Sequence, residues 1–124
     1  MARDRAAALR FYRAAADQDH AKSINMVGRF VEEGWEMPAD AVAAAAWYRR
    51  AAEAGDFRGQ YNLASVLASG GDLDGAEAWL YRAMETATVD FLGLMAERLA
   101  KSGEPRLRRV GAIAEARAAG RALG

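Results

Sequence analysis

The stretch AAAWYRRAAEAGDFRGQYNLASVLASG, from Ala44 to Gly70, has the pattern of two helices joined by a tight turn. In its first half, apolar residues recur at intervals of three and four and so share one helix face; they are Ala44, Trp47, Tyr48, Ala51 and Ala52. Gly55 is placed to end this helix, and Asp56 is placed to cap the next one. The stretch therefore predicts a helical hairpin with an apolar stripe.

The second helix of this hairpin carries apolar residues on more than one side, among them Phe57, Tyr61, Leu63 and Leu67. We expect such a helix to be buried between two neighbours. A helical pair that cannot cover its own apolar faces needs another pair beside it, so the pattern predicts a stack of repeats.

Copies of the hairpin lie on both sides of it. Phe11-Tyr12-Arg13 precedes Trp47-Tyr48-Arg49 by 36 positions, and Trp79 follows Trp47 by 32. In the third copy, Ala87 stands where the second copy has the turn glycine Gly55. The sequence predicts a single domain with repeats at about 2–34, 38–70 and 72–103, followed by a C-terminal capping helix at 105–121.

The composition limits the classes of partner. Among 124 residues, 17 basic and 17 acidic side chains cancel, which gives no overall field that would favour nucleic acid. The sequence contains no cysteine, so neither a disulfide nor a cysteine zinc site is expected. Charges occupy the start of the chain and no long apolar run occurs, so we expect a cytoplasmic protein without a membrane span, or a periplasmic or secreted one if a leader was removed.

These residues resemble the Sel1-like repeat family, which is related to the tetratricopeptide repeat. The resemblance rests on the hairpin and on the junction before it, at Ala44, Trp47, Tyr48, Ala51, Ala52, Gly55, Gln60, Tyr61, Asn62, Leu63 and Gly70, and at Gly34, Met37, Pro38 and Asp40. It implies an all-α, right-handed superhelix of helix-turn-helix repeats with about seven helices. It also implies a non-enzymatic adaptor that holds a protein or peptide on its concave surface, without a cofactor or metal.

By analogy with tetratricopeptide arrays, we expect the concave groove on the first helix of each pair, at positions that packing does not use. These partner-binding candidates are Arg13, Arg49, Glu53, Tyr81 and Glu85. Arginine and tyrosine suit such a role because they offer bidentate contacts and a large amphipathic area. The alternative is that Arg13 with Asp17, and Arg49 with Glu53, form (i, i+4) pairs that only aid solubility.

Two further surfaces, on the C-terminal helix and on the first helix, are candidates for binding. The C-terminal helix carries a basic stripe at Arg106, Arg109, Arg117 and Arg121, which could dock an acidic partner, RNA or an anionic membrane, or serve as the polar outer face of a capping helix. The first helix exposes Ala6, Ala7 and Ala14 with no helix before it, which leaves a self-associating assembly unit as the runner-up function.

An enzyme, such as a hydrolase, is the weak alternative. The single histidine, His20, lies beside Asp17 and Asp19, but it aligns with the capping residue Asp56, which favours a cap over an acid–base role. The acidic cluster of Glu32, Glu33, Glu36 and Asp40 has no calcium-loop spacing and is interpreted as a solvated helix end. Trp35, in the same junction, is expected to meet either a neighbouring side chain or a partner.

Overall fold

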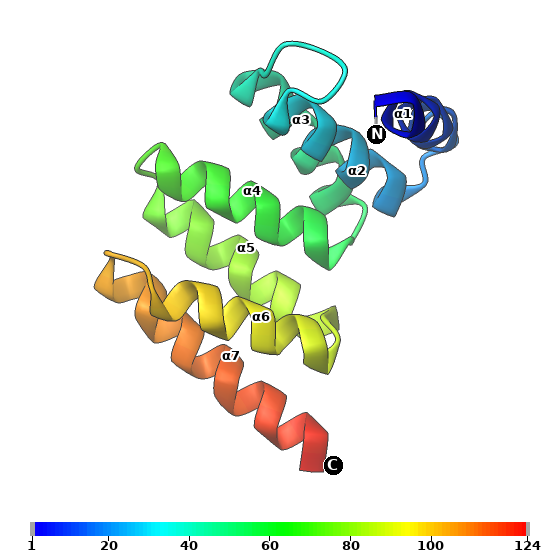
Figure 1. Cartoon of the computed structure of the whole chain (residues 1–124). Coiled ribbons are helices and arrows are strands. Elements are labelled where there is room, and N and C mark those ends of the chain that lie inside the picture. The colour runs from blue at the N-terminus through cyan, green and yellow to red at the C-terminus, as the bar shows by residue number, and fades with distance from the viewer. Residues whose placement is uncertain (1, 124) are drawn as a thin grey trace.

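The computed structural model of this chain describes residues 2–123, and within them it is all-α, as the sequence predicts (Figure 1). The helices are α1 (Ala2–Ala16), α2 (Ala21–Glu33), α3 (Ala41–Glu53), α4 (Phe57–Ser69), α5 (Leu73–Thr86), α6 (Val89–Ala100) and α7 (Pro105–Leu123). Short turns join them, except for a longer loop between α2 and α3, and α1 and α7 lie at opposite ends of the stack (Figure 1).

Side-chain caps fix where four of these helices begin. Asp40, Asp56, Asp72 and Thr88 each accept a hydrogen bond from the backbone N–H three residues further on, at 2.8–3.1 Å. Such a bond satisfies one of the amides that the first turn leaves without a partner. Asp74 and Asp90 lie in the first turns of α5 and α6, but Asp72 and Thr88 form the caps.

The turns inside the three sequence copies differ in one backbone angle. Gly55 has φ +92°, and Asp19, which is 36 positions earlier, has φ +59°. Asp tolerates this left-handed conformation better than most residues do. Ala87, in the third copy, is buried and has an extended backbone with φ −63°. The next residue, Thr88, is already the cap of α6. The third turn therefore needs no glycine.

Alternate helices fall on opposite sides of the stack: α2, α4 and α6 on one, and α3, α5 and α7 on the other (Figure 1). The most extensive packing joins α2 to α3, α4 to α5 and α6 to α7. This pairing is offset by one helix from the repeat boundaries expected from the sequence. The offset matters for the site, because it makes α2, α4 and α6 the first helix of each closely packed pair.

Tyr48 links the two sides of the stack in the N-terminal half. It is fully buried, together with Ala44, Ala51 and Ala52 of the predicted stripe. Its ring lies against Gly28 of α2, where an added Cβ would come within 2.7 Å of the tyrosine Cε1. Only glycine leaves room for so close an approach of ring and helix.

Trp47 departs from expectation, because it is half-buried and not part of the core. The Arg50 guanidinium lies 5.1 Å from the centre of its ring. Trp35 has neighbours on several sides: Phe30 meets its ring edge-on, and the guanidinium groups of Arg5 and Arg29 stack on it. The hypothesis that Trp35 meets a neighbouring side chain is therefore confirmed.

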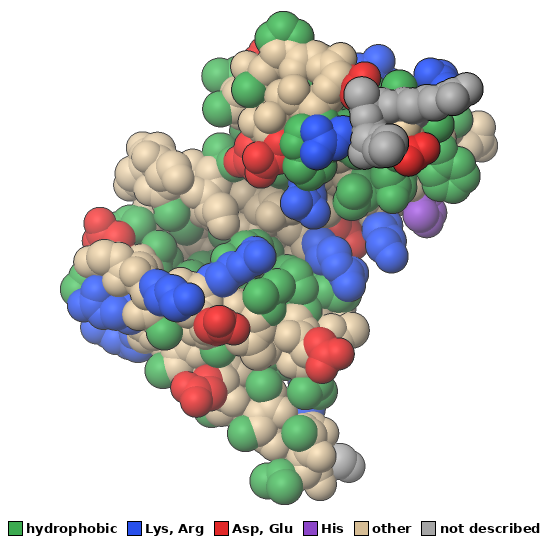
Figure 2. Space-filling view, in the orientation of Figure 1, with side chains coloured by type: hydrophobic (Ala, Val, Ile, Leu, Met, Phe, Trp, Pro, Cys, Tyr) green, Lys and Arg blue, Asp and Glu red, His purple; other side chains and the backbone are tan. Residues whose placement is uncertain are grey.

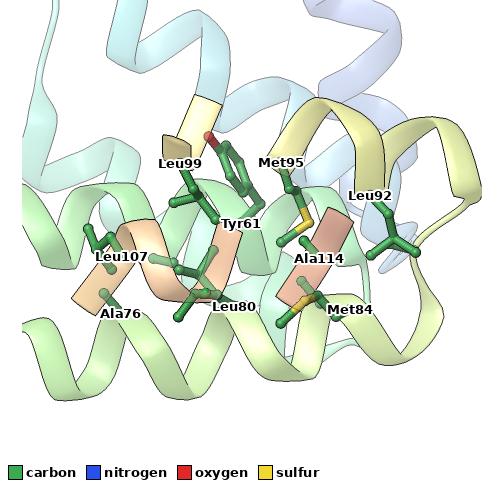
Figure 3. Packing of buried hydrophobic residues seen from close by; sticks show 13 residues of the cluster. Tyr61, Ala76, Leu80, Met84, Leu92, Met95, Leu99, Leu107 and Ala114 are labelled. Carbon is green, nitrogen blue, oxygen red and sulfur yellow. The ribbon is translucent and has the colours of Figure 1, made fainter. Parts of the chain in front are cut away.

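The C-terminal half has its own apolar cluster, in which side chains from α4, α5, α6 and α7 meet (Figure 3). Its fully buried members include Met84, Leu92, Met95, Val110 and Ala114. Since α7 supplies Leu107, Val110 and Ala114 to this cluster, it covers the apolar side of α6. The helix at 105–121 therefore packs on the array, and its role as a cap stays a prediction.

Candidate functional site

A groove crosses the side of the stack formed by α2, α4 and α6, with a volume of about 850 Å³. Side chains of these three helices line it, together with Thr88 at the start of α6: Lys22, Asn25, Met26, Arg29, Glu32, Glu33, Arg58, Tyr61, Asn62, Ser65, Thr88, Asp90, Phe91, Leu94 and Arg98. Figure 2 shows basic side chains gathered along the middle of this side of the molecule. The volume is in the range of sites that hold a drug-sized ligand.

The repeat brings equivalent positions of successive helices together in the groove. Lys22 and Arg58 are 36 positions apart, as are Met26 and Asn62. Sequence analysis missed these residues, although a signal was present. Positions outside the apolar stripes, such as Lys22 and Arg58, recur at the same offset of 36 as the core positions. A repeat array lays such positions side by side.

Four cations line the groove: Lys22, Arg29, Arg58 and Arg98. Within residues 2–123, none of them forms an ion pair at 4.0 Å or less. The three arginines stack on aromatic rings instead; the Arg58 guanidinium lies 4.5 Å from the Phe57 ring centre and 5.6 Å from that of Phe91. Stacking of this kind orients a guanidinium while leaving its N–H edge available.

Two asparagines join α2 to α4 at the groove. Asn62 Nδ2 donates a hydrogen bond to Asn25 Oδ1 at 2.8 Å. Asn25 is buried and Asn62 half-buried, and both line the groove. This bond uses the NH2 group of Asn62 and the carbonyl oxygen of Asn25. The carbonyl oxygen of Asn62 and the NH2 group of Asn25 are left for a ligand or water.

Glu32, which lines the groove, is hydrogen-bonded to the buried core residue Tyr48. The Tyr48 hydroxyl donates to Glu32 Oε1 at 2.7 Å. Burial, and then the hydrogen bond to this carboxylate, raise the pKa of Tyr48 well above its ordinary value of 10.0. The phenol therefore keeps its proton across the physiological range and holds Glu32 in place.

A smaller apolar hollow of about 190 Å³ lies among α4, α5, α6 and α7, and we call it the anchor hollow. It shares Ser65 with the groove. The rest of its lining is mostly Ala and Leu: Ala64, Ala68, Ala76, Leu80, Leu99, Ser102 and Leu107.

The five groove candidates from the sequence lie elsewhere. Arg13, Arg49, Glu53 and Glu85 are exposed and Tyr81 is half-buried, on α1, α3 and α5, and none of the five lines the groove. The closely packed pairs begin one helix later than the repeats in the sequence, and the groove lies on α2, α4 and α6. A role for these five residues in partner binding stays a prediction.

The basic stripe of α7 is partly used inside the molecule. Arg106 donates to Asp74 and Glu77 of α5, and these hydrogen bonds raise its pKa. Arg121 donates to the carbonyl oxygens of Met84 and Ala87 at 2.8 and 2.7 Å. These two arginines hold α7 on α5, Arg106 near the start of α5 and Arg121 at its carboxyl end, where a cation is favoured. Arg109 and Arg117 are exposed.

His20 occupies the N-cap position of α2, as its alignment with Asp56 predicts. Its side chain makes no capping bond to the backbone; Nδ1 lies 2.6 Å from Ser23 Oγ. A serine beside a histidine has the composition of a nucleophile and its base. Ser23 is only 2% exposed, so its hydroxyl is withdrawn from any substrate in solution.

Comparison with known proteins gives likenesses both in sequence and in structure. Over 50 residues the chain is 46% identical to the Sel1-repeat-containing protein YjcO of Escherichia coli K12, a match that covers 40% of this chain and 22% of that protein. The YjcO proteins of Escherichia coli O157:H7 and Shigella flexneri match equally. No family model matches.

The structural likeness is to the crystal structure of a Sel1 repeat protein from Oxalobacter formigenes. The TM-score is 0.65 at 21% identity, over 87% of this chain and 48% of the other. Together these findings confirm the resemblance to Sel1-like repeat proteins and the solenoid fold. The chain spans about a fifth of YjcO and about half of the solved structure. None of the described helices has the length and apolar character needed to cross a membrane.

Proposed function

We propose that this Sel1-like repeat solenoid is a binding module that holds a segment of a protein partner in the groove of α2, α4 and α6. The observation that carries the proposal is the groove itself, with its four cations that form no ion pair within residues 2–123. Repeat arrays of this kind present long curved surfaces that suit extended ligands. The resemblance to Sel1 repeat proteins supports an interaction scaffold over an enzyme.

The test is selection from a random peptide library displayed on phage, with the chain as bait. Ser65→Trp places an indole in the groove at an exposed position and should leave the fold intact. Ala46→Trp, at an exposed position of α3 outside the groove, is the matched control.

Peptides selected on the wild type should bind Ser65→Trp at least about tenfold more weakly, because the indole blocks contacts worth about 1.4 kcal/mol or more. They should bind Ala46→Trp unchanged. Equal affinity for all three proteins would show that the groove is not the site.

Self-association through α1 is a second candidate, and Phe11 favours it. This ring is 68% exposed, at the position that corresponds to Trp47 in the next copy. Static light scattering over a wide concentration range tests it: a mass that rises with concentration and is reduced by Phe11→Ser would support assembly. A constant monomer mass would remove this candidate.

A further inference from the structure

We propose that the segment held in the groove is extended and acidic, and that it places one apolar side chain in the anchor hollow. This inference rests on the proposed function and adds the chemistry of the partner. Three observations carry it: the asparagine pair, the stacked arginines and the hollow.

The asparagine pair matches an extended backbone. Because Asn62 Nδ2 donates to Asn25 Oδ1, the Asn25 NH2 group and the Asn62 carbonyl oxygen have no side-chain or backbone partner within residues 2–123. One donor and one acceptor, held side by side by two helices, complement the C=O and N–H of a peptide group. Exchanging O and N in both amides preserves this pattern.

The arginines favour carboxylates on that segment. Arg58 is half-buried against Phe57 and Phe91, and Arg98 lies 5.9 Å from the Tyr61 ring centre. An arginine whose plane is stacked offers its N–H groups to a carboxylate in bidentate geometry. Acidic side chains on both edges of the segment could thus meet Arg58 and Arg98.

The groove's own carboxylates argue against a nucleic acid. Glu32, Glu33 and Asp90 line the same groove as the cations. A phosphate chain carries its charges on the backbone itself and would meet these groups, whereas an extended peptide places an uncharged backbone on the asparagine pair and turns alternate acidic side chains to its two edges. We therefore commit to a peptide, and an RNA probe serves as a test of this choice.

The anchor hollow suits one apolar side chain. It holds about 190 Å³ among Ala and Leu side chains. An apolar cavity of about 150 Å³ is known to take a benzene-sized guest. Because the hollow shares Ser65 with the groove, a segment on the asparagine pair has an adjacent place for a leucine or phenylalanine side chain.

The experiment measures fluorescence anisotropy of labelled probes with the full chain. The probes are the heptapeptide EDELEDE, its charge-reversed form KRKLKRK, the form EDESEDE without the apolar side chain, and a uridine decanucleotide. EDELEDE should bind at least about tenfold more tightly than each of the others, and more weakly as salt is raised.

Arg58→Gln should weaken EDELEDE binding about tenfold, as expected for one lost charge-assisted hydrogen bond. Arg10→Gln, at an exposed arginine of α1 outside the groove, should leave EDELEDE binding unchanged. Thermal melting checks that both variants fold.

Equal or tighter binding of KRKLKRK or of the RNA would overturn the inference, and so would the absence of EDELEDE binding. The proposed function fails separately, only if library-selected peptides retain their affinity for Ser65→Trp. A chain that captures such peptides in the groove but ignores EDELEDE would keep its function and lose this partner chemistry.

Discussion

The groove side of the stack and the side formed by α5 and α7 both carry arginines, but these arginines have different neighbours. On α7, Arg106 and Arg121 reach across to carboxylates and carbonyl oxygens of α5. On the groove side, Arg58 and Arg98 rest on aromatic rings and form no ion pair within residues 2–123. Arginine spacing on a helix therefore does not mark a binding site; in the proposed function the site is marked by cations that line one groove and form no ion pair within residues 2–123.

The largest expected effect concerns Tyr48, which connects the two sides. Tyr48→Ala should lower the free energy of unfolding by about 3–5 kcal/mol, because it leaves a cavity beside Gly28. Trp47→Ala should cost less, about 1–2 kcal/mol, because that ring is half-buried. Urea denaturation followed by circular dichroism measures both. A greater loss for Trp47→Ala would reverse our assignment of the core aromatic residue.

The comparison of arginines gives a crossed prediction. Arg121→Ala should lower the free energy of unfolding by about 1 kcal/mol, through its lost bonds to the end of α5, and should leave peptide capture unchanged. Arg58→Ala should weaken capture and leave the melting temperature nearly unchanged. The comparison breaks if Arg58→Ala unfolds the chain at a much lower temperature, or if Arg121→Ala abolishes capture.

A smaller effect follows from the raised pKa of Tyr48. Above its ordinary pKa of 10.0 the unfolded phenol loses its proton while the folded one keeps it, so stability falls as pH rises. Tyr48→Phe lacks this proton. Between about pH 8 and pH 10.5 the wild type should lose roughly 0.8 kcal/mol more than Tyr48→Phe does. Parallel pH profiles of the two proteins would mean that the phenol is not held in its neutral form.

Much of the fold could be predicted because the same helix pattern occurs more than once in the sequence. The alignment of Tyr12 with Tyr48, and the caps at Asp40 and Asp56, place helices within a few residues of where they lie. These features depend on local spacing and capping, which a sequence shows directly.

The groove could not be placed from the same pattern. Apolar spacing says that α3 is buried along one stripe, but it does not say whether α3 packs more closely on α2 or on α4. The groove lies on the side of α2, α4 and α6, which the apolar spacing does not single out. The role of Arg106 was equally hidden, because Asp74 and Glu77 lie about thirty positions away and meet it only in the folded chain.

The most direct test of the central claim is a two-dimensional ¹H–¹⁵N NMR titration of the 13.4 kDa chain with a library-selected peptide. If the groove of α2, α4 and α6 holds the partner, the largest shift changes will fall on the backbone amides of Asn25, Arg58 and Phe91 and on the side-chain amide of Asn62. Changes centred on Arg13, Arg49 and Glu53 instead, with the groove amides unmoved, would contradict the account and place the site on α1 and α3.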